Sequence, residues 1–269
     1  MQVHSLYVYP VKSLAGIQVS SFCIDDFGPA GDRRWMIVDV DRQFVSQRNN
    51  PELARIGTRL EAGRVLVNIP GEGEFPLIAG DEDCRVRIWG DWAKAVYGDH
   101  DASEALSRYC GATFRFVFMP DESFRRVDAS RVTEYRRVSF ADGFPFLITS
   151  LASLEELNSR LETPVEMRRF RPNIVVEGAA PWDEDEWRAL SINGTAFSLV
   201  KPCSRCVMTT VDPDHGTKAP DLQPLRELGK FRRTPDGVIF GMNAIHESSG
   251  EIRVGSPVAI TTTAKTENQ

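Results

Sequence analysis

The run Arg64-Val65-Leu66-Val67-Asn68-Ile69 decides the class of the fold, because it places Val and Ile at every second position. Ala62-Gly63 precedes the run and Pro70-Gly71 follows it, and such pairs are typical of turns. A short alternating run between two turns predicts a β-strand. Similar runs lie at Arg34–Val38 and Cys84–Trp89. Residues 1 to about 100 are therefore predicted to be β-rich, as in a barrel or a sandwich.

The whole chain has the size and composition of an ordinary soluble globular protein. Its 269 residues suffice for one large domain or two of ordinary size. The fractions of 42% hydrophobic and 26% charged residues exclude a disordered or fibrous chain. The longest strongly apolar stretch, Phe144–Leu154, is interrupted by Pro145 and by hydroxyl side chains, and it is too short to cross a bilayer.

Charge and cysteine content indicate the compartment and exclude some partners. The net charge of −6 argues against sequence-independent attraction to nucleic acid or to an anionic membrane surface. Met1–Ser13 lacks the basic-then-apolar order of a secretory signal, and the five cysteines are an odd number. Both features favour a reducing compartment. We therefore expect a cytoplasmic protein without a nucleic-acid or membrane partner.

Helices are predicted where apolar residues recur at helical spacing between cap residues. Asp101 is the expected N-cap of the first helix and Gly111 its left-handed stop. Ser153 and Glu156 fit a capping box in the second, and Gly229 follows the third. The predicted helices are Ala102–Cys110, Leu151–Leu161 and Leu222–Leu228.

The second half combines two of these helices with strands, which predicts an α+β unit. The polar, Arg-rich segment Asp121–Arg137 has weak periodicity and is expected to be a surface loop between two units. Asp183–Glu186 is predicted to be a solvated turn or a helix start, and its charge would suit a basic redox partner. Thr261–Gln269 is polar and expected to be frayed. Further strands are predicted at Phe114–Phe118, Asn173–Val176, Phe197–Val200 and Cys206–Val211.

The segment Cys203-Ser204-Arg205-Cys206 is the most distinctive candidate for chemistry. A structural zinc site would need a second pair of ligands, and no recognisable pair follows. A thioredoxin-like dithiol would need a helix N-terminus, whereas β-like runs flank this pair. A single reactive or metal-binding thiolate is favoured by nearby cations, and thiolate suits a soft or high-valent metal. Two buried core cysteines remain the common alternative.

A second candidate is the basic segment Arg168–Asn173. If it is extended, Arg169, Arg171 and Asn173 point to one side, because side chains alternate along a strand. Guanidinium and amide groups on one face suit an anionic ligand that carries a heterocycle. A solvated strand edge is the alternative.

Two further segments carry cations at the ends of predicted strands. Lys12 and Ser13 follow an aromatic-rich run, and Arg33 lies just before the run Arg34–Val38. Ligand contacts are often made at strand ends, although plain surface positions would look the same.

In combination the motifs are more specific than any one of them. Their order along the chain resembles that of the MOSC family, in particular its molybdenum-cofactor enzymes related to the mitochondrial amidoxime-reducing component. The resemblance covers nearly the whole chain, as far as a closing strand at Val254–Val258. The motifs are Tyr9–Ser13, Gly31–Trp35, Leu157–Leu161, Phe170–Val176, and Cys203–Cys206 followed by Thr209–Asp214.

The resemblance implies a β-rich α+β fold in two domains. An N-terminal MOSC β-barrel-like domain would span residues 1–115. A C-terminal MOSC domain, built on a β-barrel with flanking helices, would span residues 116–262. Residues 263–269 would form a disordered tail.

The resemblance also implies the residues of a molybdopterin site. Cys206 would be the thiolate ligand of molybdenum and the catalytic residue. Asp142-Gly143-Phe144 stands where relatives have two hydroxyl side chains after an Asp, so a contact there must use backbone groups. Asn243 stands where some relatives have an aromatic residue, which leaves a hydrogen bond possible. The implied cofactor-binding residues are Lys12, Ser13, Arg33, Arg171, Asn173, Ser204, Arg205 and Asn243.

The implied activity is a molybdenum-dependent reduction of small N-hydroxylated compounds, such as hydroxylaminopurines and amidoximes, by oxygen-atom transfer to the Cys-ligated metal. Electrons would come from a separate flavoprotein or ferredoxin-type protein, because no cysteine follows Cys206 to hold the iron–sulfur cluster that some bacterial relatives carry in a C-terminal ferredoxin domain. No pyridoxal-phosphate domain fits in the chain.

Two other functions are compatible with the same motifs. Cys206 could carry a persulfide for cofactor sulfuration, supplied by an external donor. The chain could also bind the molybdenum cofactor without catalysing a reaction.

Overall fold

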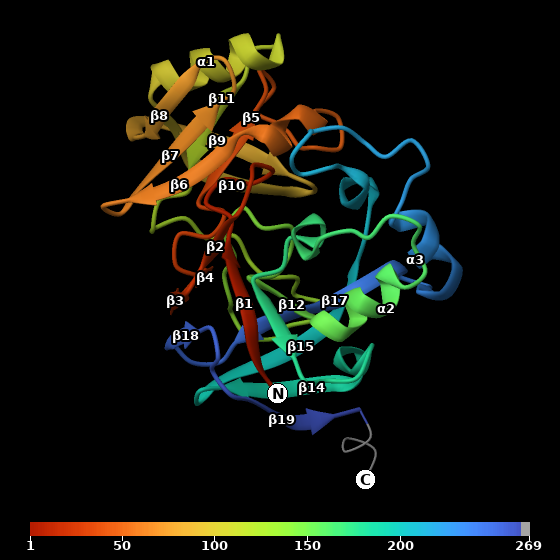
Figure 1. Ribbon diagram of the computed structural model, residues 1–269. Helices are drawn as coiled ribbons and strands as arrows, with labels where there is room; N and C mark the ends of the chain where they lie inside the picture. The colour runs from red at the N-terminus through yellow and green to blue at the C-terminus, as the bar shows by residue number, and fades with distance from the viewer. Residues whose placement is uncertain (265–269) are drawn as a thin grey trace.

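The structure is a computed structural model that describes residues 1–264, and β-strands dominate it (Figure 1). The largest sheet has nine strands and fills the lower part of Figure 1. In spatial order its strands are β19 (Val258–Thr263), β14 (Trp187–Ile192), β15 (Thr195–Ser204), β17 (Gly237–His246), β12 (Phe146–Ser150), β13 (Ile174–Glu177), β1 (Gln2–Val8) and β2 (Ile17–Val19), with β16 (Arg233–Thr234) paired to β17.

Three smaller sheets complete the fold, two of them in its upper part (Figure 1). A four-stranded sheet has the order β5 (Trp35–Val38), β11 (Arg115–Phe118), β10 (Asp91–Gly98) and β9 (Ala79–Ile88). A three-stranded sheet contains β6 (Gly57–Glu61), β7 (Arg64–Ile69) and β8 (Gly73–Leu77). The third contains β18 (Glu251–Arg253), β3 (Ser21–Asp25) and β4 (Gly28–Pro29).

The alternation in β7 builds the core of the upper part, as the sequence predicts. Val65, Val67 and Ile69 are buried, whereas Arg64 and Asn68 are exposed. The helix α1 (His100–Cys110) packs on this core through buried Ala102, Ala105 and Leu106. Burying such side chains stabilises the fold by about 1.5–3 kcal/mol for each large one.

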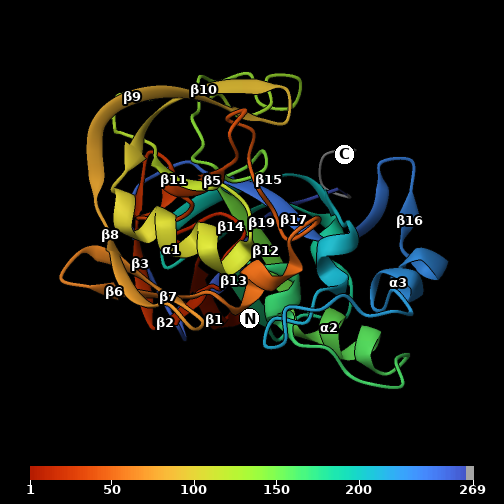
Figure 2. The same cartoon turned by 90° about the horizontal axis from the view of Figure 1, so that it is seen from above.

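The helices α2 (Leu151–Asn158) and α3 (Leu225–Phe231) lie side by side on the opposite side of the molecule from β9 (Figures 1 and 2). Leu154 and Leu157 of α2 and Leu228 of α3 share one apolar cluster with Phe170 and Phe240. This cluster supports the large sheet from one side, next to the short 3-10 helix Met167–Phe170.

The first strand of the chain belongs to the sheet of the second half. β1 pairs antiparallel with β13, with Leu6 opposite Ile174, and β2 pairs with β1. Residues 9–16 form the loop between β1 and β2, and their backbone reaches the upper part through hydrogen bonds from Lys12 to Trp35 and from Ala15 to Ile56. The predicted division near residue 115 stays a prediction, but the structure shows that residues 2–19 pair with strands beyond it.

The β-rich α+β fold is confirmed, whereas the ladders of residues 1–264 do not close into a barrel ring. The first helix is confirmed with the left-handed Gly111 at its end, but its N-cap is Asp99, not Asp101. The capping box in the second helix is wrong, because its N-cap is Ser150 and the Ser153 hydroxyl donates to the buried Glu184 instead.

Other boundaries differ because tertiary contacts override local patterns. The third helix begins at Leu225, and Gly229 lies within it instead of after it. Cys206–Val211 is not a strand, because Val207–Thr210 forms a 3-10 turn with Cys206 as its N-cap. Segment 121–137 contains no helix or strand, as expected of a loop.

The acidic segment Asp183–Glu186 is a 3-10 turn that is only partly solvated, because Glu184 is fully buried. Thr261–Thr263 belongs to β19 and is not frayed, and residues 265–269 of the expected tail lie outside the described residues. No helix in residues 1–264 has both the length and the apolar character needed to cross a bilayer.

Candidate functional site

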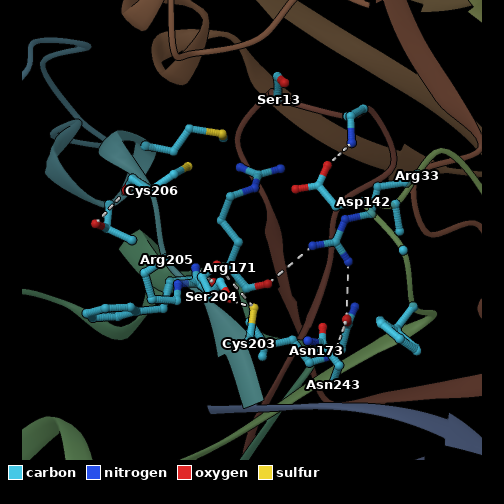
Figure 3. A pocket seen from close by; sticks show the side chains of 18 of the residues that line it. Ser13, Arg33, Asp142, Arg171, Asn173, Cys203, Ser204, Arg205, Cys206 and Asn243 are labelled. Atoms are coloured by element: carbon cyan, nitrogen blue, oxygen red, sulfur yellow. Dashed lines mark hydrogen bonds and ion pairs between the residues drawn. The ribbon is translucent and has the colours of Figure 1, made fainter. Parts of the chain in front are cut away.

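A cavity of about 300 Å³ lies where the upper part of the fold meets the large sheet (Figure 3). All nine residues that the sequence predicts for a site line it, although they come from five separate segments of the chain. They are Lys12, Ser13, Arg33, Arg171, Asn173, Ser204, Arg205, Cys206 and Asn243.

The two cysteines of the motif have different surroundings. Cys203 lies near the end of β15, and its Sγ accepts a hydrogen bond from Nη1 of Arg205 at 2.9 Å. Cys206 begins the 3-10 turn that follows, and its backbone oxygen accepts the Thr209 hydroxyl at 3.0 Å. Both side chains are partly exposed at the cavity, and neither is in a disulfide. The Cys203 sulfur is thus engaged by the protein's own cation, which distinguishes it from Cys206.

A buried network fixes Arg33. Asp32 is 1% exposed and accepts bonds from Nη1 of Arg33 at 2.6 Å and from the Tyr9 amide at 2.8 Å. Burial raises the pKa of Asp32, while these donors favour its charged form. Nη2 of Arg33 reaches the Arg171 carbonyl oxygen at 3.2 Å. A buried carboxylate thus holds Arg33 at the boundary between the upper strands and the large sheet.

Asn173 is the centre of this network. Its Nδ2 donates to the Tyr7 carbonyl oxygen at 3.2 Å and to Asp32 at 3.1 Å. Its Oδ1 accepts from Arg33 at 3.1 Å and from the Leu147 amide at 3.2 Å. Since an amide side chain offers two donors and two acceptor positions, the protein uses all of them. Asn173 therefore positions Arg33 from the cavity wall.

Arg171 and Arg33 both lie over the ring of Tyr9, with guanidinium carbons 4.3 Å and 4.4 Å from its centroid. Nη1 of Arg171 donates to the Leu14 carbonyl oxygen at 2.7 Å, whereas its buried Nη2 has no partner in the described protein. Burial lowers the pKa of Arg171 to about 10. A buried cation with an unused donor favours an anionic ligand.

The backbone around the cavity is held in unusual conformations. Ser13, Arg33, Trp89 and Arg171 all have positive φ, at 72°, 48°, 55° and 56°. L-residues seldom adopt this region, and such strain concentrates at functional sites. The predicted extended run at Arg169–Asn173 is wrong for this reason. Residues 167–170 form a 3-10 turn that the left-handed Arg171 ends, yet Arg169, Arg171 and Asn173 still reach the same cavity.

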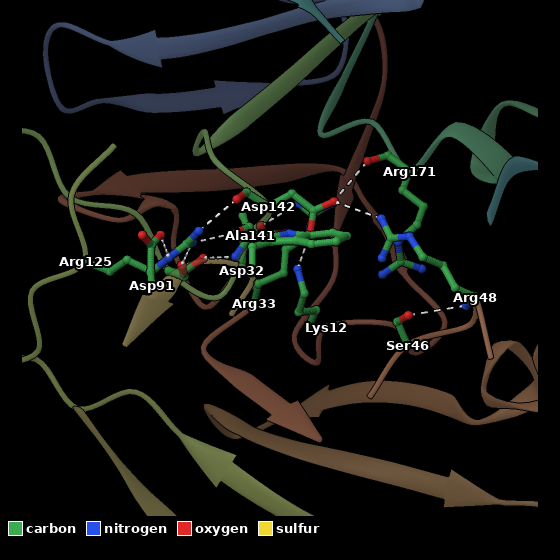
Figure 4. Close-up of polar contacts among 12 residues, drawn as sticks. Lys12, Asp32, Arg33, Ser46, Arg48, Asp91, Arg125, Ala141, Asp142 and Arg171 are labelled. Carbon is green, nitrogen blue, oxygen red and sulfur yellow. Dashed lines mark hydrogen bonds and ion pairs between the residues drawn. The ribbon is translucent and has the colours of Figure 1, made fainter. Parts of the chain in front are cut away.

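The upper wall of the cavity carries an ion-pair cluster that the sequence interpretation missed (Figure 4). The Lys12 ammonium pairs with Asp142, and Nη2 of Arg48 lies 3.7 Å from the other Asp142 oxygen. Nε1 of Trp89 donates to Asp142 at 3.3 Å. Burial lowers the pKa of Lys12 to about 8. Burial alone would raise the pKa of Asp142, but Lys12 and Arg48 hold it well below its usual range.

The missed residues lie in segments without a recognisable motif. The sequence interpretation considered backbone contacts at Gly143 and Phe144 and gave the Asp142 side chain no role, whereas that side chain faces Lys12. Arg48 belongs to a polar loop, Trp89 occupies a hairpin tip, and Met208 follows the motif cysteine. The one available signal was Trp89 beside Gly90, since an aromatic residue at a turn is seldom needed for the core.

The remaining predicted residues line the lower wall. The Ser204 hydroxyl donates to the Asp236 carbonyl oxygen at 2.7 Å, and Nδ2 of Asn243 reaches the Pro202 carbonyl oxygen at 3.4 Å. Nη2 of Arg205 donates to the Phe170 carbonyl oxygen at 2.7 Å, while its buried Nε has no partner in residues 1–264.

The cavity as a whole is strongly cationic. Among the described residues that line it, six are basic and one, Asp142, is acidic. Thiol groups and a cluster of cations thus line the same cavity of about 300 Å³. Such a donor set suits a ligand that combines an anionic group with a soft or high-valent metal. Residues 1–264 contain no group of three His, Cys, Asp or Glu side chains arranged to hold a metal ion.

Comparisons with known proteins match both parts of the chain. Residues 1–113 match the MOSC N-terminal beta barrel domain, and residues 135–259 match the MOSC domain. Mitochondrial amidoxime reducing component 2 of Rattus norvegicus is 31% identical over 95% of this chain and 82% of its own length. Mitochondrial amidoxime-reducing component 1 of Homo sapiens gives the same identity and shares. Molybdenum cofactor sulfurase of Oryza sativa subsp. japonica is 26% identical over 90% of this chain but 32% of its own length.

Proposed function

Because the chain belongs to the MOSC family and has both its N-terminal beta barrel domain and its MOSC domain, we propose that it binds the molybdenum cofactor and reduces N-hydroxylated compounds. The observation that carries the proposal is that Cys206 and six basic side chains line one cavity. The names of the relatives support reduction of amidoximes, and the relation to a molybdenum cofactor sulfurase supports the choice of cofactor.

The residues of the cavity fit this cofactor. The unpartnered Nη2 of Arg171 and Nε of Arg205 are buried polar groups that an anionic, heterocyclic ligand would satisfy. Lys12, Ser13 and Arg33 would hold its pterin and phosphate. Cys206 would be the thiolate ligand of molybdenum, because its sulfur lies at the cavity and thiolate is a soft ligand.

When bound, the cofactor supplies two-electron oxygen-atom transfer, which removes the hydroxyl oxygen of an N–OH group. The protein's part is to orient the reactants and to limit water. Phe144, Phe146 and Phe170 line the cavity and are at most 8% exposed. Asn243, in the proposed site, would donate a hydrogen bond to an N-hydroxylated substrate. Asn173 would act through Arg33, which it positions.

We further propose that a separate flavoprotein or ferredoxin-type protein supplies the electrons and that the protein works in the cytoplasm. Each turnover consumes two electrons and two protons and releases water together with the amine or amidine. The Cys203–Cys206 motif alone does not supply the four thiolates of a common iron–sulfur cluster.

Matched cysteine variants test the proposal. Protein made in a host that synthesises molybdopterin is expected to contain stoichiometric molybdenum and to reduce benzamidoxime and 6-hydroxylaminopurine with an artificial electron donor. Cys206→Ala should lose both molybdenum and turnover, whereas Cys203→Ala should keep the metal. Stoichiometric molybdenum without turnover would leave only cofactor binding and would reject the reductase.

A persulfide carrier is the second candidate, favoured by the similarity to the cofactor sulfurase. In that case an external donor would transfer sulfur to Cys206. Mass spectrometry of intact protein separates the two functions. A sulfur adduct on Cys206 in protein without molybdenum favours the carrier, and an unmodified Cys206 under a sulfur-donating system rejects it.

A further inference from the structure

Three donors from separate segments converge on the carboxylate of Asp142. They are the Lys12 ammonium, Nη2 of Arg48 at 3.7 Å and Nε1 of Trp89 at 3.3 Å. Lys12 follows β1, Arg48 lies between β5 and residues 51–55, and Trp89 forms the tip between β9 and β10. Two cations and an indole N–H around one point form an anion-binding arrangement.

The donors hold one another in place. The Arg48 guanidinium lies 4.5 Å from the centroid of the Trp89 ring, and the Phe44 ring lies 4.9 Å from the same ring. The Lys12 ammonium lies 5.3 Å from the Phe44 ring, and Lys12 is 6% exposed. These contacts place the three groups against one another in addition to their contacts with Asp142.

Asp142, the acceptor, is more exposed than Lys12 and Arg48. The Asp142 side chain is 58% exposed, and space is open beside the neighbouring Gly143. Arg125 fixes only the backbone here, because it donates to the Ala141 and Asp142 carbonyl oxygens at 2.5 Å and 2.8 Å. The exposed carboxylate of Asp142 is therefore held only by the three donor groups, among the described residues, while its backbone is fixed separately.

We propose that Lys12, Arg48 and Trp89 form an anion subsite that Asp142 fills in the free protein and that a phosphate monoester dianion takes by displacing it. The proposal rests on the proposed function in one respect, because the cofactor's phosphate is the ligand that this chemistry would serve. Arg48, Trp89 and Asp142 thereby become determinants of anion binding.

The charge of an anion decides how well it can displace Asp142 from the subsite. The two cations carry +2, and Asp142 reduces this to +1. A monoanion that displaces Asp142 replaces one negative charge by another and gains little. A phosphate dianion brings the net charge of the subsite to zero and is attracted by both cations. The side chains of Lys12 and Arg48 are only 8% and 22% exposed, so solvent screens this attraction weakly. Asp142 therefore makes the subsite prefer dianions over the monoanions that are abundant in solution.

The test is titration of the protein without added cofactor, using phenyl phosphate as the dianion and acetate as the monoanion, with binding measured by calorimetry. Asp142→Asn should bind phenyl phosphate about tenfold more tightly than the wild type, because the internal competitor is gone. Its preference for the dianion over acetate should also shrink. Asp26→Asn is the matched control, because this exposed carboxylate pairs with Arg137 away from the cavity.

Two further variants identify the donors. In the Asp142→Asn background, Arg48→Gln and Trp89→Phe should each lower the affinity for phenyl phosphate, because each removes one donor. Unchanged or weaker phenyl phosphate binding by Asp142→Asn, in protein with wild-type thermal stability, would overturn the proposal. The titration needs neither molybdenum nor Cys206 nor turnover. A protein without reductase activity can therefore still confirm the subsite, and an active reductase can still refute it.

Discussion

The guanidinium of Arg205 donates a hydrogen bond to the Cys203 sulfur at 2.9 Å. Two cysteines three residues apart suggest one shared role, but this hydrogen bond indicates that Cys203 and Cys206 have different roles. Cys203 holds the side chain of Arg205 together with the Phe170 carbonyl oxygen, and Cys206 is left facing the cavity.

Cys203→Ala is therefore expected to destabilise the protein without removing its metal. Arg205 would lose one of its two acceptors, which lowers the free energy of unfolding by about 1–2 kcal/mol. Urea unfolding measures this change. Cys203→Ser should recover part of it, because a hydroxyl oxygen also accepts a hydrogen bond. Loss of molybdenum in Cys203→Ser would show that Cys203 is a ligand instead.

Gly16→Ala should disturb the site through the ring of Tyr9. A Cβ atom at Gly16 would lie 2.6 Å from Cδ1 of Tyr9, whose ring is buried and packs against the guanidinium groups of Arg33 and Arg171. We expect a loss of about 1–3 kcal/mol in the free energy of unfolding. Gly143→Ala is the control, since no atom lies within 4 Å of its Cβ position. Equal thermal stability of the two variants would contradict this account.

Asp32→Asn should weaken the network that fixes Arg33. The substitution keeps the shape but leaves a buried guanidinium without its counter-charge, which costs about 3 kcal/mol. Thermal unfolding gives the stability, and phenyl phosphate titration of the folded variant gives the effect on the cavity. A variant with wild-type values in both measurements would show that Arg33 needs no buried partner.

Glu184 predicts a pH dependence of stability. Burial raises its pKa from the usual 4.5 to about 7, although the Ser153 hydroxyl opposes the shift. The folded chain holds this proton between about pH 4.5 and 7 while the unfolded chain releases it, so the free energy of unfolding falls as the pH rises through that window.

Glu184→Gln should remove this decline. At pH 8 the variant should exceed the wild type by up to about 3 kcal/mol, and near pH 4.5 the gain should vanish. Thermal unfolding from pH 4.5 to 8 measures the stability difference at both ends of the range. Glu186→Gln, at an exposed position, is the control. Parallel curves for wild type and Glu184→Gln would contradict the burial argument.

Local patterns predict those parts of the fold that local physics determines. The alternation of Val65, Val67 and Ile69 predicts β7, and Gly111 predicts the end of α1. Cys206 could be singled out from the sequence because its motif is compact, and it lies at the cavity. Asp142 was missed as a side chain because its partners Lys12 and Trp89 are 130 and 53 residues away, and no local pattern encodes such contacts.

In the basic segment the expected residues line one cavity, but through a different backbone geometry. Strand alternation was expected to bring Arg169, Arg171 and Asn173 to one face, but a 3-10 turn and a left-handed Arg171 do so. The residue types indicated an anionic ligand, whereas the backbone path depended on contacts with Tyr9 and Leu14.

The pairing of β1 with β13 has a consequence for biosynthesis. The amide of Asn173 reaches the Tyr7 carbonyl oxygen across 166 residues of chain. A ribosome releases the first strand long before its neighbour exists, so the amino-terminal residues must wait unpaired while the upper sheets form behind them. The cavity can be completed only after Asn243, the last residue along the chain that lines it, has emerged, which makes assembly of the site a late event in synthesis. Cofactor insertion would then have to follow translation of most of the chain.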